Sequence, residues 1–317
     1  MNSQSEQISP LIPSLGLGTW KSSRGEVYTA VKEAISIGYR HIDCAPAYDN
    51  EAEVGAAVSE ALQAGTVARE DLWITSKLWN NAHEPAQVLP ALQKTLEDLR
   101  LDYLDLFLIH WPVAFRAGVA YPRNREDWIP LAEVPTIATW QAMEECVGKR
   151  LVRHIGVCNF SVKKLDDLRR QATIPPVMNQ VELHPYLQQQ ALYDFCRENG
   201  ILLTAYSPLG SGDRPKGLKK ADEPVLLQDP VIRDIAEKHR YTPGQVLLAW
   251  ALHRDIVVIP KSVNPQRLRE NFAAADLDLD SADMAAIAAL DRGHRYVDGT
   301  FWLTNDSPYT IEALWDE

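Results

Sequence analysis

The segment LDLFLI, residues 104–109, is a nearly continuous apolar run of strand length, and His110 follows it directly. Runs of this kind are typical of parallel strands that are covered by helices on both faces. Helix-like sequence lies on either side. Pro85–Leu99 carries leucines at spacings of three and four, and Thr136–Val147 is a second amphipathic stretch. The segment therefore predicts a parallel strand in an α/β protein.

The same alternation of short apolar runs and longer amphipathic stretches continues along the chain in both directions. The expected strands are Leu15–Gly18, His41–Asp43, Trp73–Leu78, Leu104–Ile109, Val152–Cys158, Val177–Val181, Leu202–Tyr206 and Ile256–Pro260. The expected helices are Glu26–Ile37, Glu51–Ala64, Pro85–Leu99, Thr136–Val147, Val162–Ala172, Gln188–Asn199, Asp229–His239, Pro243–Leu252, Pro265–Ala273 and Ser281–Leu290. Eight strand-then-helix units predict an α/β fold of the (β/α)8 TIM-barrel class, with residues 1–317 as one domain. An open doubly wound sheet is the alternative, but no G-x-G-x-x-G fingerprint follows any strand.

Capping residues predict where three of these helices begin or end. Asn50 is expected to cap the helix that begins at Glu51, and Ser281 to cap the last helix. Gly200 is expected in the C′ position behind the helix that ends at Asn199. These positions are predictions about backbone hydrogen bonding that a structure can test.

Composition and charge exclude several classes of protein. The 317 residues are 46% hydrophobic and 24% charged, enough to bury a large core. The net charge of −11 argues against a general nucleic-acid or anionic-membrane surface. The polar start MNSQSEQISP has no secretory pattern, and no apolar stretch reaches about 18 residues. We therefore expect a cytoplasmic protein without nucleic-acid or membrane partners, whose cysteines (Cys44, Cys146, Cys158 and Cys196) stay reduced in the core.

Three segments are too long to be plain connections, namely 112–135, 207–228 and the tail from residue 292. Each follows the C-terminal end of a strand or ends the chain, where barrel enzymes build their sites. The first segment and the tail carry the aromatic residues Phe115, Tyr121, Trp128, Tyr296, Phe301, Trp302, Tyr309 and Trp315. Such side chains either line a pocket for an organic substrate or pin the loops to the barrel, and the sequence leaves both interpretations open.

Polar residues stand at or just after the ends of three consecutive predicted strands. Asp43 ends the second strand, Tyr48 lies in the loop behind it, Lys77 lies at the end of the third, and His110 follows the fourth. Because these ends face one mouth of a barrel, the four side chains can converge. Each residue alone is more often a cap, a solvated charge or a structural histidine, so the hypothesis of a site depends on their co-occurrence.

Eight segments in chain order resemble the aldo-keto reductases. They are LGLGTWK (Leu15–Lys21), GYRHIDCAPAYDNEAEVG (Gly38–Gly55), ITSKLWN (Ile74–Asn80), DLFLIHWP (Asp105–Pro112), GVCNFS (Gly156–Ser161), NQVELHPY (Asn179–Tyr186), AYSPLGSGDRP (Ala205–Pro215) and IPKSVNPQRLRENF (Ile259–Phe272). The resemblance runs from about Ile12 to Leu290 and is closest to the branch of aldose and aldehyde reductases. It implies an enzyme that moves hydride from NADPH to the carbonyl carbon of an aldehyde or ketone.

The resemblance also implies a role for each of the four polar residues. Tyr48 would be the general acid that protonates the carbonyl oxygen, although a free tyrosine, with a pKa of about 10, is a poor donor at neutral pH. Lys77 is expected to lower that pKa, and Asp43 to pair with Lys77. His110 would orient the carbonyl as a neutral imidazole.

An NADPH/NADP+ site is the next implication of the resemblance. Its implied residues are Thr19, Trp20, Lys21, Asp43, Cys158, Asn159, Gln180, Tyr206, Ser207, Leu209, Ser211, Asp213, Lys261, Ser262, Val263, Arg267, Glu270 and Asn271. Asn159 and Gln180 would hold the nicotinamide carboxamide, and Tyr206 would stack on the ring. Lys21 and Asp213 would latch the loop that covers the pyrophosphate.

The adenosine end of that site would be gripped by a basic helix start. Lys261, Ser262 and Arg267 match the residues that hold the 2′-phosphate, and Glu270 and Asn271 match the adenine contacts. Cations and helix N-terminal donors both favour a phosphate, so the resemblance implies NADPH over NADH. An ordinary basic helix end is the alternative interpretation.

The implied substrate pocket is aromatic. Its residues are Trp20, Tyr48, Trp79, His110, Trp111 and Trp302. A pocket of this kind would favour aromatic or aliphatic aldehydes, and plain core packing is the alternative for the tryptophans. A hydroxysteroid, sugar or polyol oxidoreductase is the alternative activity, because the tail RYVDGTFWLTNDSPY does not closely match the aldose reductase tail.

The chain departs from the family pattern at two places. Cys158 stands where relatives commonly carry serine, and a thiol is a weak donor. The usual N-terminal strand and Asn-Gly turn are absent, so Ser9-Pro10 is expected to form a different turn or the first residues to be loose.

Two other classes of function are alternatives to the reductase. A binding or structural protein on the same fold stays open as a hypothesis. A metal-dependent hydrolase lacks clustered ligands, so no metal is expected. We expect a monomer.

Overall fold

The barrel is closed by eight parallel strands in chain order. The computed structural model describes residues 12–220, 222–304 and 306–316. The strands are β1 (Leu17–Gly18), β2 (His41–Asp43), β3 (Trp73–Leu78), β4 (Leu104–Ile109), β7 (Val152–Cys158), β8 (Met178–Glu182), β9 (Leu202–Tyr206) and β10 (Val257–Val258). Bridges from Leu15 to Val258 and from Gly18 to Lys261 join the last strand back to the first. This closure confirms the predicted (β/α)8 barrel over the open sheet.

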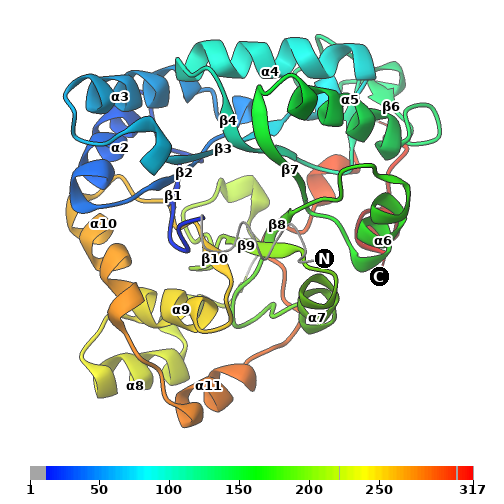
Figure 1. Cartoon of the computed structure of the whole chain (residues 1–317). Helices are drawn as coiled ribbons and strands as arrows, with labels where there is room; N and C mark the ends of the chain where they lie inside the picture. The colour runs from blue at the N-terminus through cyan, green and yellow to red at the C-terminus, as the bar shows by residue number, and fades with distance from the viewer. Residues whose placement is uncertain (1–11, 221, 305, 317) are drawn as a thin grey trace.

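Helices form a ring outside the strands (Figure 1). The ring consists of α2 (Glu26–Ile37), α3 (Glu51–Gln63), α4 (Pro85–Leu99), α5 (Thr136–Gly148), α6 (Val162–Gln171), α7 (Gln190–Glu198), α9 (Pro243–Leu252) and α10 (Pro265–Phe272). Helix α10 packs against both α2 and α9, which completes the ring at the point where the chain returns to its start. Helix α8 (Pro230–His239) packs on α9, and α11 (Ser281–Ala288) packs on α8 outside the ring.

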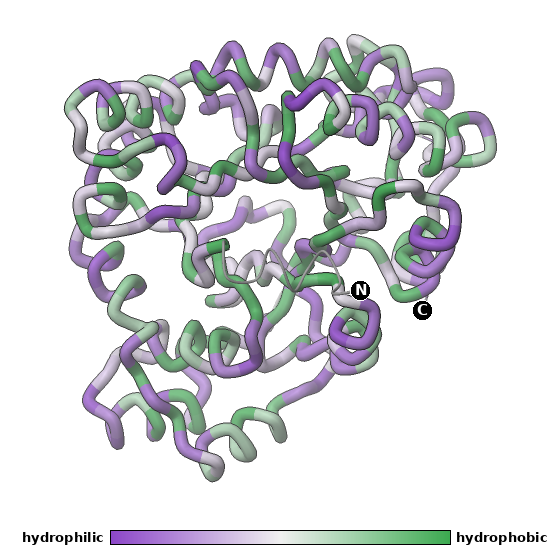
Figure 2. The backbone as a smooth tube through the Cα atoms, in the orientation of Figure 1, coloured by the Kyte–Doolittle hydropathy of each residue, from purple (hydrophilic) through white to green (hydrophobic). Residues whose placement is uncertain are grey.

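The apolar side chains of β4 belong to two different hydrophobic clusters. Phe107 and Ile109 belong to the large cluster that fills the space between strands and helices. Leu106 and Leu108 belong to a separate cluster with side chains from other strands. Because successive side chains of a strand point to opposite faces, the second cluster lies inside the barrel. Figure 2 shows the turns of the outer helices alternating between hydrophobic and hydrophilic, as expected of helices with one face on a core.

All eighteen predicted strands and helices are present, and eight of them have the predicted bounds. Strands β2, β3, β4, β7 and β9 and helices α2, α4 and α9 begin and end as predicted. Strands β1 and β10 are shorter than predicted, because the closure at Leu15 and Lys261 consists of isolated bridges and not a continuous ladder. Gly200, predicted at C′, has a φ of +66° and follows the C-cap residue Asn199.

Two of the predicted helix caps are wrong. Asn50 stands at the N-cap of α3, but its amide makes no capping bond and donates to the carbonyl oxygens of Thr19, at 2.9 Å, and Ser22. It therefore ties the loop after β1 to the start of α3. Helix α11 is capped by Asp280, whose carboxylate accepts from the second and third backbone N–H groups, and not by Ser281.

The long loops contain short elements that periodicity does not reveal. Segment 112–135 forms a hairpin of β5 (Ala114–Phe115) and β6 (Trp128–Ile129). The tail contains η8 (Thr300–Trp302) and α12 (Ile311–Trp315). The other 3-10 turns are η1 (Pro46–Tyr48), η2 (Arg69–Asp71), η3 (Asn80–Ala82), η4 (Arg125–Asp127), η5 (Lys216–Leu218), η6 (Leu226–Gln228) and η7 (Ala273–Asp276).

Other expectations concern the chain as a whole. All four cysteines are buried free thiols, as predicted. Within the described residues, no helix combines the length and the apolar character needed to span a bilayer. The turn expected at Ser9-Pro10 lies outside the described residues.

Candidate active site

One cavity of about 580 Å³ at the C-terminal ends of the strands gathers most of the predicted site residues. Those that line it are Thr19, Trp20, Lys21, Asp43, Tyr48, Trp79, His110, Trp111, Cys158, Asn159, Gln180, Tyr206, Ser207, Leu209, Ser211, Asp213, Lys261, Ser262, Val263, Arg267 and Trp302. Three predicted residues do not line it. Lys77 is buried behind Asp43, and Glu270 and Asn271 lie further along α10.

Several lining residues are absent from the sequence-based set. Tyr121 and Phe301 line the cavity, and the sequence marked them only as loop aromatics. Leu218, Leu227 and Val297 also line it. They are ordinary aliphatic residues, so their position in two long loops was the one signal that could have found them.

A buried ion pair between neighbouring strands lies at the base of the cavity. Asp43 ends β2, Lys77 lies on β3, and the parallel register of the two strands brings their side chains together. The Lys77 ammonium donates to the Asp43 carboxylate and, at 2.9 Å, to the carbonyl oxygen of Cys44. The second carboxylate oxygen accepts from the Gln180 amide at 2.7 Å. Burial is the largest single influence and opposes the charge on Lys77, but the attraction of Asp43, together with that of Tyr48 and Cys158, outweighs it and raises the pKa of Lys77 above its ordinary value.

Tyr48 lies at the end of η1, with the Lys77 ammonium 5.1 Å from the centre of its ring. Enclosure by protein raises the pKa of the Tyr48 hydroxyl above its ordinary value of 10.0, and Lys77 acts in the opposite direction. The predicted effect of Lys77 is therefore confirmed in direction, but enclosure outweighs it and the net pKa of Tyr48 is raised. The physical reason is that Lys77 is already paired with Asp43, so it returns only part of the solvation that the phenolate loses.

His110 forms the adjoining wall as a neutral ring. Its backbone N–H donates to the carbonyl oxygen of Leu78, which continues the pairing of β3 and β4 by one residue. The ring meets Tyr48 and Trp79 edge to face, with centroids 5.8 and 5.1 Å apart. Burial lowers the pKa of His110 well below 6.5, and the positive charge of Lys77 lowers it further. The prediction of a neutral imidazole is confirmed.

Polar side chains of β7, β8 and β9 form the opposite wall. Asn159, at a left-handed φ of +63°, donates through its amide to the carbonyl oxygen of His110 at 3.0 Å. Its carbonyl accepts from the Tyr206 hydroxyl at 2.8 Å. Cys158, beside it, is buried, and burial raises the pKa of its thiol, so it stays protonated. These contacts hold Asn159 and Tyr206 in place.

An ion pair joins the two sides of the cavity away from Tyr48. The Lys21 ammonium lies 2.6 Å from the Asp213 carboxylate and donates to the Ser211 hydroxyl at 3.1 Å. Lys261 approaches the same carboxylate at 3.6 Å. The expected pair of Lys21 and Asp213 is therefore present in the structure, and it connects the segment after β1 to the loop after β9.

The far end of the cavity carries the donors that a phosphate requires. Lys261 and Arg267 line it next to the N-terminus of α10. Asn264 caps that helix by accepting from the backbone N–H of Arg267 at 3.0 Å. Two cations at a helix N-terminus suit a phosphate group, and a cavity of this volume suits a cofactor-sized ligand. The residues present thus fit a phosphorylated dinucleotide.

The end nearest His110 is aromatic. Trp302 packs against Trp79 and Trp111 with ring centroids 5.9 and 5.6 Å apart, and Tyr121 lies 6.0 Å from Trp79. Tyr309 has a different role, because its hydroxyl donates to the carbonyl oxygen of Ile129 at 2.6 Å and fastens the tail to the β5–β6 hairpin. Some of the loop aromatics therefore line the cavity, whereas Tyr309 pins the tail to the rest of the protein.

Comparison with known proteins agrees with this arrangement. Residues 14–292 match the family model described as the Aldo/keto reductase family. The chain belongs to this family. An aldo/keto reductase of Synechocystis sp. is 57% identical over 306 residues, 96% of this chain and 94% of that protein. Aldo-keto reductase family 1 member A1 of Gallus gallus is 49% identical over 288 residues, 90% of this chain and 88% of that protein.

A solved structure gives the same result for the fold of this aldo-keto reductase. The aldose reductase from Schistosoma japonicum superposes with a TM-score of 0.84 at 39% identity, covering 93% of this chain and 94% of that one. The family consists of carbonyl oxidoreductases that use a nicotinamide cofactor. Among the described residues, no three His, Cys, Asp or Glu side chains gather as a metal site would require.

Proposed function

We propose that this aldo-keto reductase is an NADPH-dependent enzyme that reduces aldehydes and ketones to alcohols, with Tyr48 as the general acid. One observation carries the proposal. A single cavity has Tyr48 and the buried Asp43–Lys77 pair at one end and the cations Lys261 and Arg267 at the other. A proton donor and a phosphate-binding end in one cavity are what hydride transfer from a phosphorylated nicotinamide cofactor requires.

Proton transfer is the step that the chain's own residues perform. The reduced nicotinamide, when bound, supplies the hydride that the carbonyl carbon accepts. The Tyr48 hydroxyl donates its proton to the carbonyl oxygen, so the C=O bond becomes an alcohol. Lys77 stabilises the phenolate that remains, and Asp43 holds Lys77 charged and in position. A proton from solvent then restores Tyr48.

The raised pKa of Tyr48 is consistent with this acid role. A hydroxyl whose pKa lies above 10.0 keeps its proton throughout the neutral range, so every molecule holds the proton that reduction consumes. His110, kept neutral by burial, can donate one hydrogen bond to the carbonyl oxygen without adding a charge. Trp79 and Trp111 exclude water from the reacting groups.

Residues for the cofactor follow from the cavity wall. We assign the carboxamide to Asn159 and Gln180, and the 2′-phosphate to Lys261 and Arg267. The other proposed contacts that line the cavity are Thr19, Trp20, Lys21, Asp43, Cys158, Tyr206, Ser207, Leu209, Ser211, Asp213, Ser262 and Val263. Glu270 and Asn271, which lie further along α10 and do not line it, are proposed for the adenine because of the family resemblance.

The substrate that this cavity favours is a neutral aromatic or aliphatic aldehyde. The cationic side chains that line the cavity, Lys21, Lys261 and Arg267, gather at the Asp213 and α10 end. Around Trp302 the lining is aromatic and aliphatic. We also propose that the enzyme works as a monomer, which light scattering would test.

The direct test is NADPH oxidation by the purified protein with a panel of aldehydes, ketones and aldose sugars, repeated with NADH. We expect turnover with NADPH, fastest for aromatic or aliphatic aldehydes. Tight NADPH binding without turnover across the panel would contradict the enzyme and favour a binding protein on the same fold.

Preference for NADPH over NADH has its own test. Removing Lys261 and Arg267 together, as Lys261→Ala/Arg267→Ala, should weaken NADPH binding by roughly ten- to a hundredfold, because charge-assisted bonds to a phosphate are lost. NADH binding should change little. Arg269→Ala is the matched control, because Arg269 lies on the same helix but pairs with Glu33 and does not line the cavity. An unchanged preference in the double variant would refute the assignment.

A further inference from the structure

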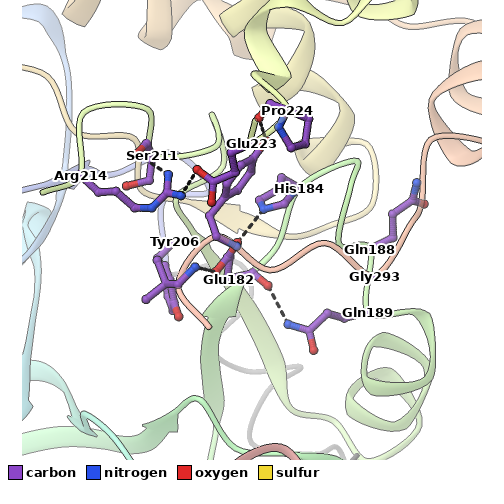
Figure 3. A network of polar contacts seen from close by, with 12 residues as sticks. Glu182, His184, Gln188, Gln189, Tyr206, Ser211, Arg214, Glu223, Pro224 and Gly293 are labelled. Atoms are coloured by element: carbon purple, nitrogen blue, oxygen red, sulfur yellow. Dashed lines mark hydrogen bonds and ion pairs between the residues drawn. The ribbon is translucent and has the colours of Figure 1, made fainter. Parts of the chain in front are cut away.

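Glu182 ties the C-terminal tail to the barrel. It is the last residue of β8, and its two carboxylate oxygens accept the backbone N–H groups of Tyr296 and Val297, each at 2.7 Å. The His184 imidazole lies 2.8 Å from one of the same oxygens (Figure 3). Burial opposes the charge, but these hydrogen bonds hold the pKa of Glu182 below its ordinary value, so the carboxylate is ionised. The tail is thereby anchored to a buried charge at this point.

Tyr296 carries the connection onward to the loop after β9. We call residues 207–220 and 222–228 the cofactor loop. The Tyr296 hydroxyl donates to the carbonyl oxygen of Pro224 at 2.8 Å. The Arg214 guanidinium lies 5.0 Å from the centre of its ring. Gly210, at a φ of +82°, approaches the ring so closely that a Cβ there would lie 3.2 Å from it. Tyr296 is thus packed into the cofactor loop by its hydroxyl and by its ring.

Arg214 connects Tyr296 to other residues of the cofactor loop. It is 3% exposed, pairs with Glu223, and donates to the backbone carbonyl of Ser211 at 3.2 Å. Its neighbour Asp213 is the residue that pairs with Lys21 across the cavity. The part of the loop that holds the ion pair is therefore held by the same group that stacks on Tyr296.

On its other side, Tyr296 is followed by the residues that form the aromatic end of the cavity. We call Val297, Phe301 and Trp302 the substrate wall, since all three line the cavity. The buried Tyr296 side chain is therefore hydrogen-bonded to the cofactor loop, and the next residue in the chain, Val297, is the first residue of the substrate wall.

We propose that Tyr296, held by Glu182, is a positioning residue that couples the substrate wall to the cofactor loop. Removing contacts of Tyr296 should lower substrate affinity and speed cofactor release together, because the cofactor loop and the substrate wall are both positioned by this residue. The identity of the two ligands rests on the proposed function, whereas the coupling is a property of the protein alone.

The first experiment measures hydrogen exchange of the complete, ligand-free protein by mass spectrometry. Tyr296→Phe removes only the hydroxyl bonded to Pro224 and keeps the ring. We expect amides of residues 211–220 to exchange roughly two- to tenfold faster, which is the effect of losing one hydrogen bond. Unchanged exchange in that segment would overturn the inference.

Tyr309→Phe is the matched control. Tyr309 is a buried tyrosine of the same tail, but its hydroxyl bonds to Ile129 and Ala114 of the β5–β6 hairpin. This variant should speed exchange in the hairpin and leave residues 211–220 unchanged. Equal acceleration of that segment in both variants would mean general loosening of the tail and would refute a specific coupling.

The second experiment uses NADPH and an aromatic aldehyde. Tyr296→Phe should raise the KM for the aldehyde and the NADPH release rate several-fold, while hydride transfer in a single turnover stays within about twofold. Wild-type KM and release in this variant would overturn the positioning role. If the wild-type protein neither binds NADPH nor turns over, the proposed function fails, and the exchange data still decide the coupling.

Discussion

Two parts of the cavity that both lie near His110, the group around Tyr48 and the aromatic wall formed with the tail, are built in different ways. Around Tyr48, the side chains of Asp43, Lys77 and His110 lie on or directly after neighbouring strands, and the Asp43–Lys77 pair makes hydrogen bonds on both sides. At the other wall, Trp302 belongs to a 3-10 turn of the tail and is held by ring packing. Its indole N–H is buried with no hydrogen-bond partner among the described residues.

The difference separates chemistry from selectivity. Strand register fixes the distances between charges, so the group around Tyr48 tolerates few substitutions without losing the reaction. Ring packing is adaptable and non-directional by comparison, so the tail can change shape while the reaction persists. The predictions below test this division.

The largest effect is expected from Tyr48→Phe. Losing a positioned general acid should lower kcat by about 10²- to 10⁴-fold, while the Kd for NADPH changes little. Steady-state kinetics and a fluorescence titration with NADPH measure the two quantities. Tyr39→Phe is the control, because Tyr39 is a fully buried tyrosine outside the cavity whose hydroxyl donates to Leu268. It should cost about 1 kcal/mol of stability and no activity. Normal turnover of Tyr48→Phe would sink the acid role.

Breaking the buried ion pair should come next in magnitude. Lys77→Met leaves the Asp43 carboxylate buried, with the Gln180 amide as its one side-chain donor among the described residues. It should lower the free energy of unfolding by about 3–5 kcal/mol. The double variant Lys77→Met/Asp43→Asn removes both charges, so it should regain part of that stability without regaining activity. Denaturant unfolding followed by circular dichroism measures both. A single variant as stable as the wild type would show that the pair is dispensable.

The sequence predicted the strand-borne part of the site far better than the tail. Asp43, Lys77 and His110 are placed by hydrophobic runs whose length and order the chain displays, and parallel strand ends must meet at one mouth. The closure of the barrel and some helix bounds followed from the same periodicity. The predictions that failed concern single side chains at helix ends. Asn50 has the right residue type for a cap, but its amide has two carbonyl partners in the loop after β1.

Quantities that depend on several groups at once could not be predicted from the sequence. The pKa of Tyr48 is a balance between enclosure and a lysine shared with Asp43, and no spacing of residues reveals which is larger. Likewise Val297 and Leu218 reach the cavity through the path of two loops that lack periodicity. The link from Glu182 to Tyr296 joins residues 114 positions apart, which only a three-dimensional structure shows.

A change in the tail should have a smaller effect, confined to selectivity. Trp302→Phe should change the ratio of kcat/KM between an aromatic and a short aliphatic aldehyde by about tenfold or less, because one ring of the wall is reduced and no charge is altered. Trp315→Phe is the control, since Trp315 packs against Trp111 but does not line the cavity. A loss of turnover with every aldehyde in Trp302→Phe would break the division between the two parts.

The smallest effect should be that of pH on the wild-type enzyme. Reduction needs Tyr48 protonated, so it is lost only as pH rises through a pKa that lies above 10.0. It needs His110 neutral, so it is lost only as pH falls through a pKa well below 6.5. Between about pH 7 and pH 9, kcat/KM should therefore change by less than about twofold, and Trp302→Phe should share that plateau. A break within it would reveal another titrating group in the reaction.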